Sequence, residues 1–216
     1  MTDYFPFLPK EDVFFVDTCA FGLLDRVDLR KKLPPKDYIE RVEEEVSKMR
    51  LLTEKLSRMD NWLTIQEVIQ EFKRGAKKIG RQRKKAWSDE VRHALRELAE
   101  QKKQSGLLLK EEYRNATKNF TESIEKKIEI LLPKIQYTFM RRGGKIDDKN
   151  TDCKLISTAL AYAEDMPIGI FSHDRQLLHT FSYAAVIYHL PIKSTYIIDE
   201  RNERVVSTEE YLEEHE

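Results

Sequence analysis

The stretch from Asp12 to Leu23, DVFFVDTCAFGL, restricts the fold more than any other part of the sequence. Val13–Val16 is a short continuous apolar run, which is typical of a central parallel strand buried on both faces. The run ends at Asp17, which Thr18 follows. Because open α/β sheets bind ligands at the carboxyl ends of their strands, Asp17 is a candidate site residue. A turn or a helix cap is the alternative role for an aspartate in this position.

Strand-like and helical segments alternate along most of the chain. An apolar stripe at spacings of three and four residues predicts a long helix that begins at Pro34-Pro35 and ends before Asp60. Further segments follow: a strand at Trp62–Ile65, a helix from Gln66, a helix from Asn150 or Thr151, strands at Pro167–Phe171, Tyr196–Ile198 and Glu203–Val206, and a final helix capped by Ser207. This order predicts an α/β fold with a mostly parallel central sheet flanked by helices.

A long helical insertion interrupts this alternation over residues 73–140. It opens with Lys73–Lys85 (KRGAKKIGRQRKK), which holds eight basic residues and no acid. Two apolar stripes at helical spacing follow, Trp87–Leu98 and Tyr113–Leu131, and they predict an antiparallel hairpin. A chain of 216 residues is long enough for one core with such an elaboration. We therefore predict a single domain over residues 1–216.

Charge, cysteine content and hydropathy limit the class of protein. Basic and acidic residues number 38 each, so only local clusters of charge can indicate a partner. The two cysteines, Cys19 and Cys153, do not make a disulfide framework, which favours a reducing cytoplasm. No apolar run approaches the roughly 18 residues of a membrane span, and the N-terminus lacks the basic segment of a signal peptide. We expect a cytoplasmic protein with no membrane partner.

Three acids are expected to meet at one edge of the sheet. Asp17 and Asp174 each follow a predicted strand, and Asp152 lies in the first turn of a helix, where the helix dipole favours an anion. A fourth acid from the helix after Trp62–Ile65 would complete the group. Close carboxylates need a counterion, and all-oxygen ligation selects Mg²⁺ or Mn²⁺. Such a site suits phosphodiester hydrolysis, because the metal activates water and stabilises charge on the phosphate.

Four short motifs, in their order along the chain, resemble those of the PIN domain, the fold of many Mg²⁺-dependent ribonucleases. VFFVDTCAF resembles the opening strand with its first acid, Asp17. TIQEVIQEF resembles the second motif, whose acid falls on Glu71, with Glu67 as a weaker match. NTDCKLISTALAYA resembles the third motif with its acid at Asp152, and IFSHDRQLL resembles the fourth with its acid at Asp174.

The resemblance implies a Mg²⁺- or Mn²⁺-dependent nuclease whose catalytic metal ligands are Asp17, Glu71, Asp152 and Asp174. Thr18 and Ser172 either orient water at the metal or cap helices. Gln176 stands where many PIN domains carry a further acid. Glu71 could instead be a solvent-exposed acid on a helix without a role in the site. Asp152 could instead be an acid that the helix dipole favours in the first turn.

Local basic clusters indicate where a nucleic acid would bind. The eight cations of Lys73–Lys85 directly follow the Glu71 segment, and they could neutralise the phosphates of a bound nucleic acid. The alternative is that they form a solvated helix face. The predicted nucleic-acid-binding residues are Lys73, Arg74, Lys77, Lys78, Arg81, Arg83, Lys84, Lys85, Arg141 and Arg142. Trp87 and Tyr113 have helical spacings that favour core positions over base stacking.

These observations together predict a metal-dependent endoribonuclease, with RNA favoured over DNA as its substrate. One alternative is a structure-specific DNA nuclease of the flap-endonuclease type, which also carries basic helical insertions but usually has more site acids. Another is a catalytically inactive PIN-like scaffold that binds nucleic acid or protein, against which the four acids argue. The toxins of toxin–antitoxin pairs share the PIN fold but are usually shorter than this chain. An inhibitor protein and a second copy of the chain are both possible partners.

Overall fold

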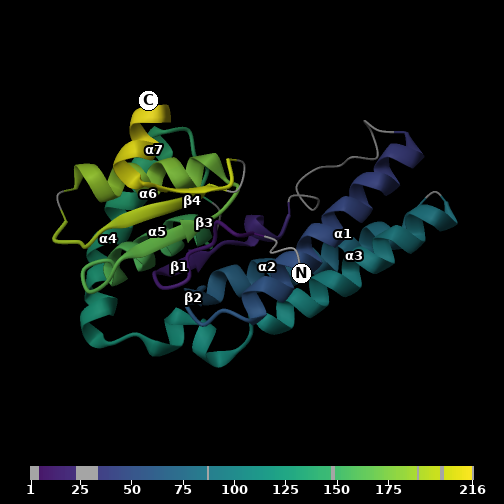
Figure 1. The fold of residues 1–216 in the computed structure, drawn as a ribbon, viewed down its shortest axis with the longest axis horizontal. Helices are drawn as coiled ribbons and strands as arrows, with labels where there is room; N and C mark the ends of the chain where they lie inside the picture. Colours follow the sequence, from purple (N-terminus) through teal and green to yellow (C-terminus); the bar gives the residue numbers. More distant parts are fainter. Residues whose placement is uncertain are drawn as a thin grey trace.

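The computed structural model describes residues 5–22, 34–86, 88–146, 149–188, 190–199 and 202–215, and strands alternate with helices along them (Figure 1). The elements are β1 (Val13–Val16), the 3-10 helix η1 (Thr18–Phe21), α1 (Pro35–Ser57), β2 (Trp62–Leu63), α2 (Gln66–Lys84), α3 (Asp89–Leu108), the 3-10 helices η3 (Glu112–Arg114) and η4 (Ala116–Asn119), α4 (Glu122–Arg141), α5 (Thr151–Tyr162), β3 (Ile168–Phe171), α6 (Arg175–Ile187), β4 (Thr195–Asp199), β5 (Arg204–Ser207) and α7 (Thr208–His215). None of the described helices is long and apolar enough to cross a membrane.

The sheet confirms the predicted α/β class and its mostly parallel strands. Its order is β2-β1-β3-β4-β5, with parallel pairing up to β4 and an antiparallel pairing of β5 on β4. The opening strand β1 is central, since it pairs with both β2 and β3. In the pairing of β1 with β3, Val16 lies opposite Phe171, so the residues after both strands meet at the same edge.

Both faces of the sheet are covered, as the apolar run of β1 predicts. Phe14 and Val16 belong to a core cluster with side chains of α1, α2 and α3, whereas Phe15 belongs to a second cluster with side chains of α4, α5 and α6. This division follows from the alternation of side chains along a strand. The two clusters therefore lie on opposite faces of the sheet, and the first continues into α1, α2 and α3.

Helices α1, α2 and α3 pack together and form an arm that extends away from the sheet (Figure 1). The predicted helical content of this region is confirmed, but the pairing of the helices differs from the prediction. The basic run is the second half of α2, which continues without a break from Gln66 to Lys84. Helix α3 packs against α1 and α2, whereas α4 returns to the sheet and packs against α5 and α6. The predicted hairpin of the Trp87–Leu98 and Tyr113–Leu131 stripes is therefore wrong.

Tertiary contacts explain this difference. Helix α3 continues through Ser105 and Gly106, although glycine has a low helix propensity, and Gly106 lies next to the ring of Phe72 on α2. The start of the second stripe forms the two short 3-10 helices η3 and η4 in place of an α-helix, and the backbone between them, at Asn115, pairs with Thr64 beside β2. There the Thr64 amide donates to the Arg114 carbonyl over 2.8 Å, and the Ala116 amide donates to the Thr64 carbonyl over 2.9 Å.

Candidate functional site

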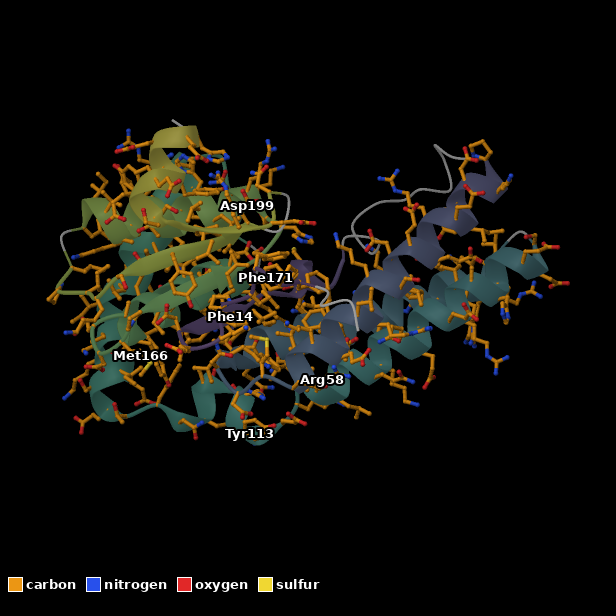
Figure 2. The ribbon with its side chains drawn as sticks, in the orientation of Figure 1. Phe14, Arg58, Tyr113, Met166, Phe171 and Asp199 are labelled. Atoms are coloured by element: carbon orange, nitrogen blue, oxygen red, sulfur yellow. The ribbon has the colours of Figure 1, made fainter. Side chains whose placement is uncertain are left out.

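The candidate site lies at the carboxyl edge of the parallel strands, on the side where the sheet meets the helical arm. In Figure 2, β3 runs from near Met166 to Phe171, and its end points toward the arm, as does the end of β4 at Asp199. Asp17 follows β1 and Ser172 follows β3 at this edge. The parallel pairing of β1 and β3 brings these two residues together.

Asp17 is almost completely buried, at 1% exposure, and its carboxylate accepts hydrogen bonds from four donors. The amide and hydroxyl of Thr18 donate to Oδ1 over 2.6 and 3.2 Å. The Cys19 amide donates to Oδ2 over 3.3 Å, and the Ser172 hydroxyl donates to the same oxygen over 2.8 Å. Asp17 thus caps η1, because an ionised carboxylate is a natural acceptor for the amides that begin a helix.

Asp174 also caps a helix. Its Oδ1 accepts from the amide of Gln176 over 2.9 Å and from the amide of Leu177 over 3.3 Å at the start of α6. Its own amide donates to the hydroxyl of Ser172 over 3.0 Å. Ser172 therefore connects the Asp17 carboxylate to the backbone of Asp174. The capping interpretation, left open in the sequence, describes the contacts of Asp17. The hydroxyls of Thr18 and Ser172 cap no helix and donate to the Asp17 carboxylate.

The other two predicted acids share a depression. Glu71, in the second turn of α2, and Asp152, in the first turn of α5, both line a cavity of about 130 Å³. The rest of its lining is Phe139, Lys145, Ile146, Asn150, Thr151 and Cys153. The hydroxyl oxygen of Thr151 is buried there and has no hydrogen-bond partner among the described residues. Polar oxygen atoms therefore converge on this depression from two helices.

Glu67 has a different role from Glu71, one turn further along α2. The Glu67 carboxylate forms an ion pair with the ammonium of Lys154 on α5, with a distance of 2.7 Å between Oε1 and Nζ. This pair joins α2 to α5 next to the depression. It supports the assignment of the second motif's acid to Glu71 and makes Glu67 a structural residue.

The four predicted acids thus form two pairs instead of one cluster. Helix η1 contacts α2, where the rings of Phe21 and Phe72 lie 5.3 Å apart edge to face, so the Asp17 segment adjoins the helix that carries Glu71. Among the described residues, however, no three histidine, cysteine, aspartate or glutamate side chains lie close enough together to hold a metal ion. The expected four-carboxylate centre is not assembled among the described residues, and the carboxylates of Asp17 and Asp174 accept from amides at the starts of η1 and α6.

The chemistry of the depression nevertheless suits a hard divalent cation. Mg²⁺ is usually bound through one or two carboxylates and keeps several of its waters. Glu71 and Asp152 are two such carboxylates in one cavity, and Thr151 adds a buried hydroxyl oxygen without a partner in the described part of the chain. The donor set therefore fits Mg²⁺ or Mn²⁺ at the depression more directly than at Asp17.

The basic run forms an exposed face of α2, which we call the α2 basic face. Its exposed members recur at helical spacing: Lys73, Arg74, Lys77, Lys78, Arg81, Lys84 and Lys85. Arg83 is partly buried. Trp87 lies outside the described residues. Tyr113 was expected in the core but is 58% exposed, and its ring instead packs 4.5 Å from the guanidinium of Arg114.

Arg141 and Arg142, the second predicted basic segment, lie at the end of α4. They line another cavity, which also contains three tyrosines from α4 and α6 that the sequence interpretation missed: Tyr137, Tyr183 and Tyr188. No spacing in the sequence indicates this grouping, because it depends on how α6 docks against α4.

Comparisons with protein-family models, curated proteins and solved structures found no match to this chain. The PIN-domain resemblance therefore rests on the four short motifs, and PIN-like identity stays a prediction. What bears on function is the geometry of the strand edge, the depression and the basic surfaces.

Proposed function

We propose that the protein is a PIN-like endoribonuclease that depends on Mg²⁺ or Mn²⁺. The observation that carries the proposal is the placement of Glu71 and Asp152 in one depression beside the carboxyl edge of the sheet. Two carboxylates from different helices would repel each other there, and a divalent cation is the natural counterion. The position agrees with the general rule that open α/β sheets bind ligands outside the carboxyl ends of their strands.

Glu71 and Asp152 are the residues that would hold the metal. When bound, such a metal supplies an activated water and positive charge for the phosphate in the transition state. Lys145 also lines the depression and would offset the negative charge of the scissile phosphate. Asp17 and Asp174, tied together through Ser172, would position the adjoining segment η1 and the start of α6.

The α2 basic face supports a nucleic acid as the substrate. The same helix carries Glu71 near its start and the cations over its remaining length. At 1.5 Å per residue, Arg81 lies roughly 15 Å along the axis from Glu71. A phosphate backbone that followed α2 would thus pass from the basic face to the depression, with its charges neutralised on the way.

One observation favours a second candidate function. Because no three acids group together in the described residues, the protein is also compatible with a PIN-like scaffold that binds nucleic acid without cleaving it. The scaffold and the nuclease share the α2 basic face and differ only in chemistry at the depression. A cleavage assay separates them.

The test uses the full chain on matched RNA and DNA of one sequence, with Mn²⁺ and with EDTA. We expect cleavage of RNA in Mn²⁺ and none in EDTA. Glu71→Gln and Asp152→Asn should each slow cleavage by about 10²–10³-fold, because each removes part of several kcal/mol of charge stabilisation. Glu67→Gln is the matched control, since it changes the same kind of side chain one turn away, outside the residues that line the depression.

Three outcomes would overturn this assignment. Cleavage that persists in EDTA, or that is unaffected in both Glu71→Gln and Asp152→Asn, excludes the depression as the catalytic centre. Cleavage of DNA alone favours the flap-endonuclease type of enzyme. Binding of RNA without any cleavage favours the scaffold.

A further inference from the structure

One side of α4 leaves apolar side chains exposed to solvent. Ile130 is 63% exposed, Tyr137 58% and Met140 53%, and Pro133 between them is exposed as well. We call these four residues the α4 seam. Large exposed apolar side chains that gather on one element, instead of being scattered singly, indicate an interaction surface. Helix α4 lies at the opposite end of the molecule from the arm (Figure 1).

The seam lies on the side of α4 that faces away from the core. Its members recur at steps of three and four residues, which places them along one side of the helix. Leu131, Ile135 and Phe139 lie on the other side and are buried in the core cluster that α4 shares with α5 and α6. The seam is therefore a second apolar side, which the described part of the chain does not cover. Steps of three and four within a period of seven residues are the pattern of two helices that pair side by side.

The charged residues beside the seam differ in sign on its two flanks. Ile130 and Pro133 are the first and fourth positions of a seven-residue period. Glu129 precedes the first position and Lys134 follows the fourth, so they lie on opposite flanks of the seam. Both are exposed, and neither side chain forms an ion pair within the described part of the chain. The seam thus has an acidic flank at Glu129 and a basic flank at Lys134.

This arrangement selects a second copy of the chain as the partner. In two parallel paired helices, the residue before the first position of one helix lies beside the residue after the fourth position of the other. Glu129 of each copy would therefore meet Lys134 of the other, and two-fold symmetry makes this contact twice. Gln136 and Arg141 occupy the same two flanking positions in the next period. An antiparallel pair would place each flank against the same flank of the partner, so Glu129 would not meet Lys134.

We propose that the α4 seam is the interface of a homodimer in which two α4 helices lie side by side and parallel, with Glu129 of each protomer paired to Lys134 of its partner. The seam is about 15 Å long, at 1.5 Å per residue. Such a small interface makes a weak dimer, for which we expect a dissociation constant between about 1 µM and 1 mM. The proposal does not depend on the nuclease assignment, because no residue of the seam lines the Glu71–Asp152 depression.

The first experiment is sedimentation equilibrium of the full chain over a wide range of concentrations. We expect a monomer–dimer equilibrium. Ile130→Asp and Tyr137→Asp should each weaken dimerisation by about 10-fold or more, because a charge enters the apolar centre of the interface from both protomers. Both positions are exposed, so the monomer should stay folded, and circular dichroism checks this. Leu107→Asp is the matched control, since Leu107 is 57% exposed but lies on α3, and it should leave dimerisation unchanged.

The second experiment exchanges the flanking charges at low ionic strength. Glu129→Lys and Lys134→Glu should each weaken dimerisation by about 5–30-fold, because two attractive contacts become repulsive. An equimolar mixture of the two variants should associate about as tightly as wild type, because both contacts of the mixed dimer join opposite charges. The double variant should recover in the same way. A partner of different sequence, or a contact made by the apolar side chains alone, would show no such rescue.

The third experiment determines the orientation of the helices. Both native cysteines are buried, so a cysteine introduced on the surface is oxidised selectively. In the parallel pair, position 140 of one protomer lies beside position 140 of the other, and Met140→Cys should form a disulfide-linked dimer under mild oxidation. In an antiparallel pair, Met140 would lie opposite Ile130 and this cross-link would not form. Leu107→Cys is the control for random collision.

Three results would overturn the proposal. They are a protein that stays monomeric at about 1 mM, the upper limit of the expected range, a dimer that Ile130→Asp and Tyr137→Asp leave intact, and a mixture of the two charge variants that does not associate. In the first case, co-sedimentation of wild type and Ile130→Asp with neutral phosphatidylcholine vesicles shows whether a lipid surface covers the seam instead.

Discussion

The hydroxyl of Ser172 donates a hydrogen bond to the carboxylate of Asp17 over 2.8 Å, although the two residues are 155 positions apart in the chain. The contact exists because β1 and β3 pair in parallel with Val16 opposite Phe171, which places the next residue of each strand at the same edge. The same hydroxyl accepts from the amide of Asp174. Ser172 therefore holds the ends of two strands and the start of α6 in one arrangement.

The first prediction concerns this hydrogen bond. Ser172→Ala should lower the free energy of unfolding by about 1–3 kcal/mol, because it leaves a buried carboxylate oxygen short of a donor. Chemical denaturation of wild type, Ser172→Ala, Asp17→Asn and the double variant gives the coupling between the two side chains. We expect a coupling of about 0.5–3 kcal/mol, as for residues in direct contact. Additive effects of the two substitutions would show that the hydrogen bond contributes nothing.

The second prediction concerns Asp174. As a helix cap it should stabilise α6, so Asp174→Ala should cost about 1 kcal/mol, and Asp174→Asn should cost less because asparagine also caps well. A cluster of four close carboxylates predicts the opposite sign for Asp174→Asn in EDTA, since the substitution would relieve repulsion. Melting curves in EDTA decide between the two. Ser88→Ala, which removes the cap of α3 in the arm, is the control for the size of a capping effect.

The third prediction concerns the α2 basic face. Replacing Lys77, Arg81 and Lys84 by glutamine should weaken RNA binding and flatten its salt dependence. The log–log slope should fall by about 0.7–0.9 for each phosphate that the variant no longer neutralises. A matched control replaces three exposed cations of α1: Lys36, Arg41 and Arg50. It makes the same change in net charge. Equal changes of slope in the two triple variants would mean that only the overall charge matters.

The strands and helices next to the sheet could be predicted well from the sequence. A strand buried on both faces must be apolar throughout, so β1 and β3 stand out as short runs that stop at a polar residue. The positions of Asp17, Asp152 and Asp174 follow from those stops and from the helix start at Thr151. The sequence could not show that the carboxylates of Asp17 and Asp174 accept hydrogen bonds from the first amides of η1 and α6, because these contacts depend on the backbone geometry after each strand.

The arm and the grouping of Tyr137, Tyr183 and Tyr188 could not be predicted to the same degree. Helix propensity at Ser105-Gly106 suggests an end, but α3 continues through both residues, where it packs against α1 and α2. The periodicity from Tyr113 suggests an α-helix, but the segment forms two short 3-10 helices on either side of Asn115, which pairs with Thr64. The grouping of these tyrosines depends on the docking of α4 against α6, and no local pattern in the sequence indicates which faces of two distant helices meet.

The fourth prediction concerns metal binding. Because a ligand that binds only the folded state stabilises it, Mn²⁺ should raise the melting temperature of the wild type, with a gain of about 2.7 kcal/mol at a concentration one hundred times its dissociation constant. A Glu71→Gln, Asp152→Asn double variant should lose most of this rise. Asp17→Asn should retain it, since Asp17 does not line the depression. If the increase in melting temperature with Mn²⁺ is lost only in Asp17→Asn, the metal site lies at the strand edge and not in the depression.

The last prediction concerns Tyr196, whose side chain links three strands. Tyr196 on β4 is paired with Gly169 on β3, and the ring of Tyr196 occupies the space that a side chain at position 169 would need. Its hydroxyl donates to the carbonyl of Val13 on β1 over 2.8 Å. Burial, with a smaller contribution from the negative charge of Asp12, raises the pKa of Tyr196 above its ordinary value.

The raised pKa sets the sign of a pH dependence. Above about pH 10 the unfolded chain releases the Tyr196 proton while the folded chain retains it, so the stability contributed by this group falls as the pH rises. Tyr196→Phe should cost about 0.5–1.5 kcal/mol at pH 7, because the hydrogen bond to Val13 is absent. Its stability should then fall less steeply than that of wild type above pH 10, by up to about 1.4 kcal/mol per pH unit. Urea unfolding midpoints of the two proteins between pH 7 and 11 measure this, and parallel curves would refute it. Other tyrosines with raised pKa values, such as Tyr162, are present in both proteins and cancel in the difference.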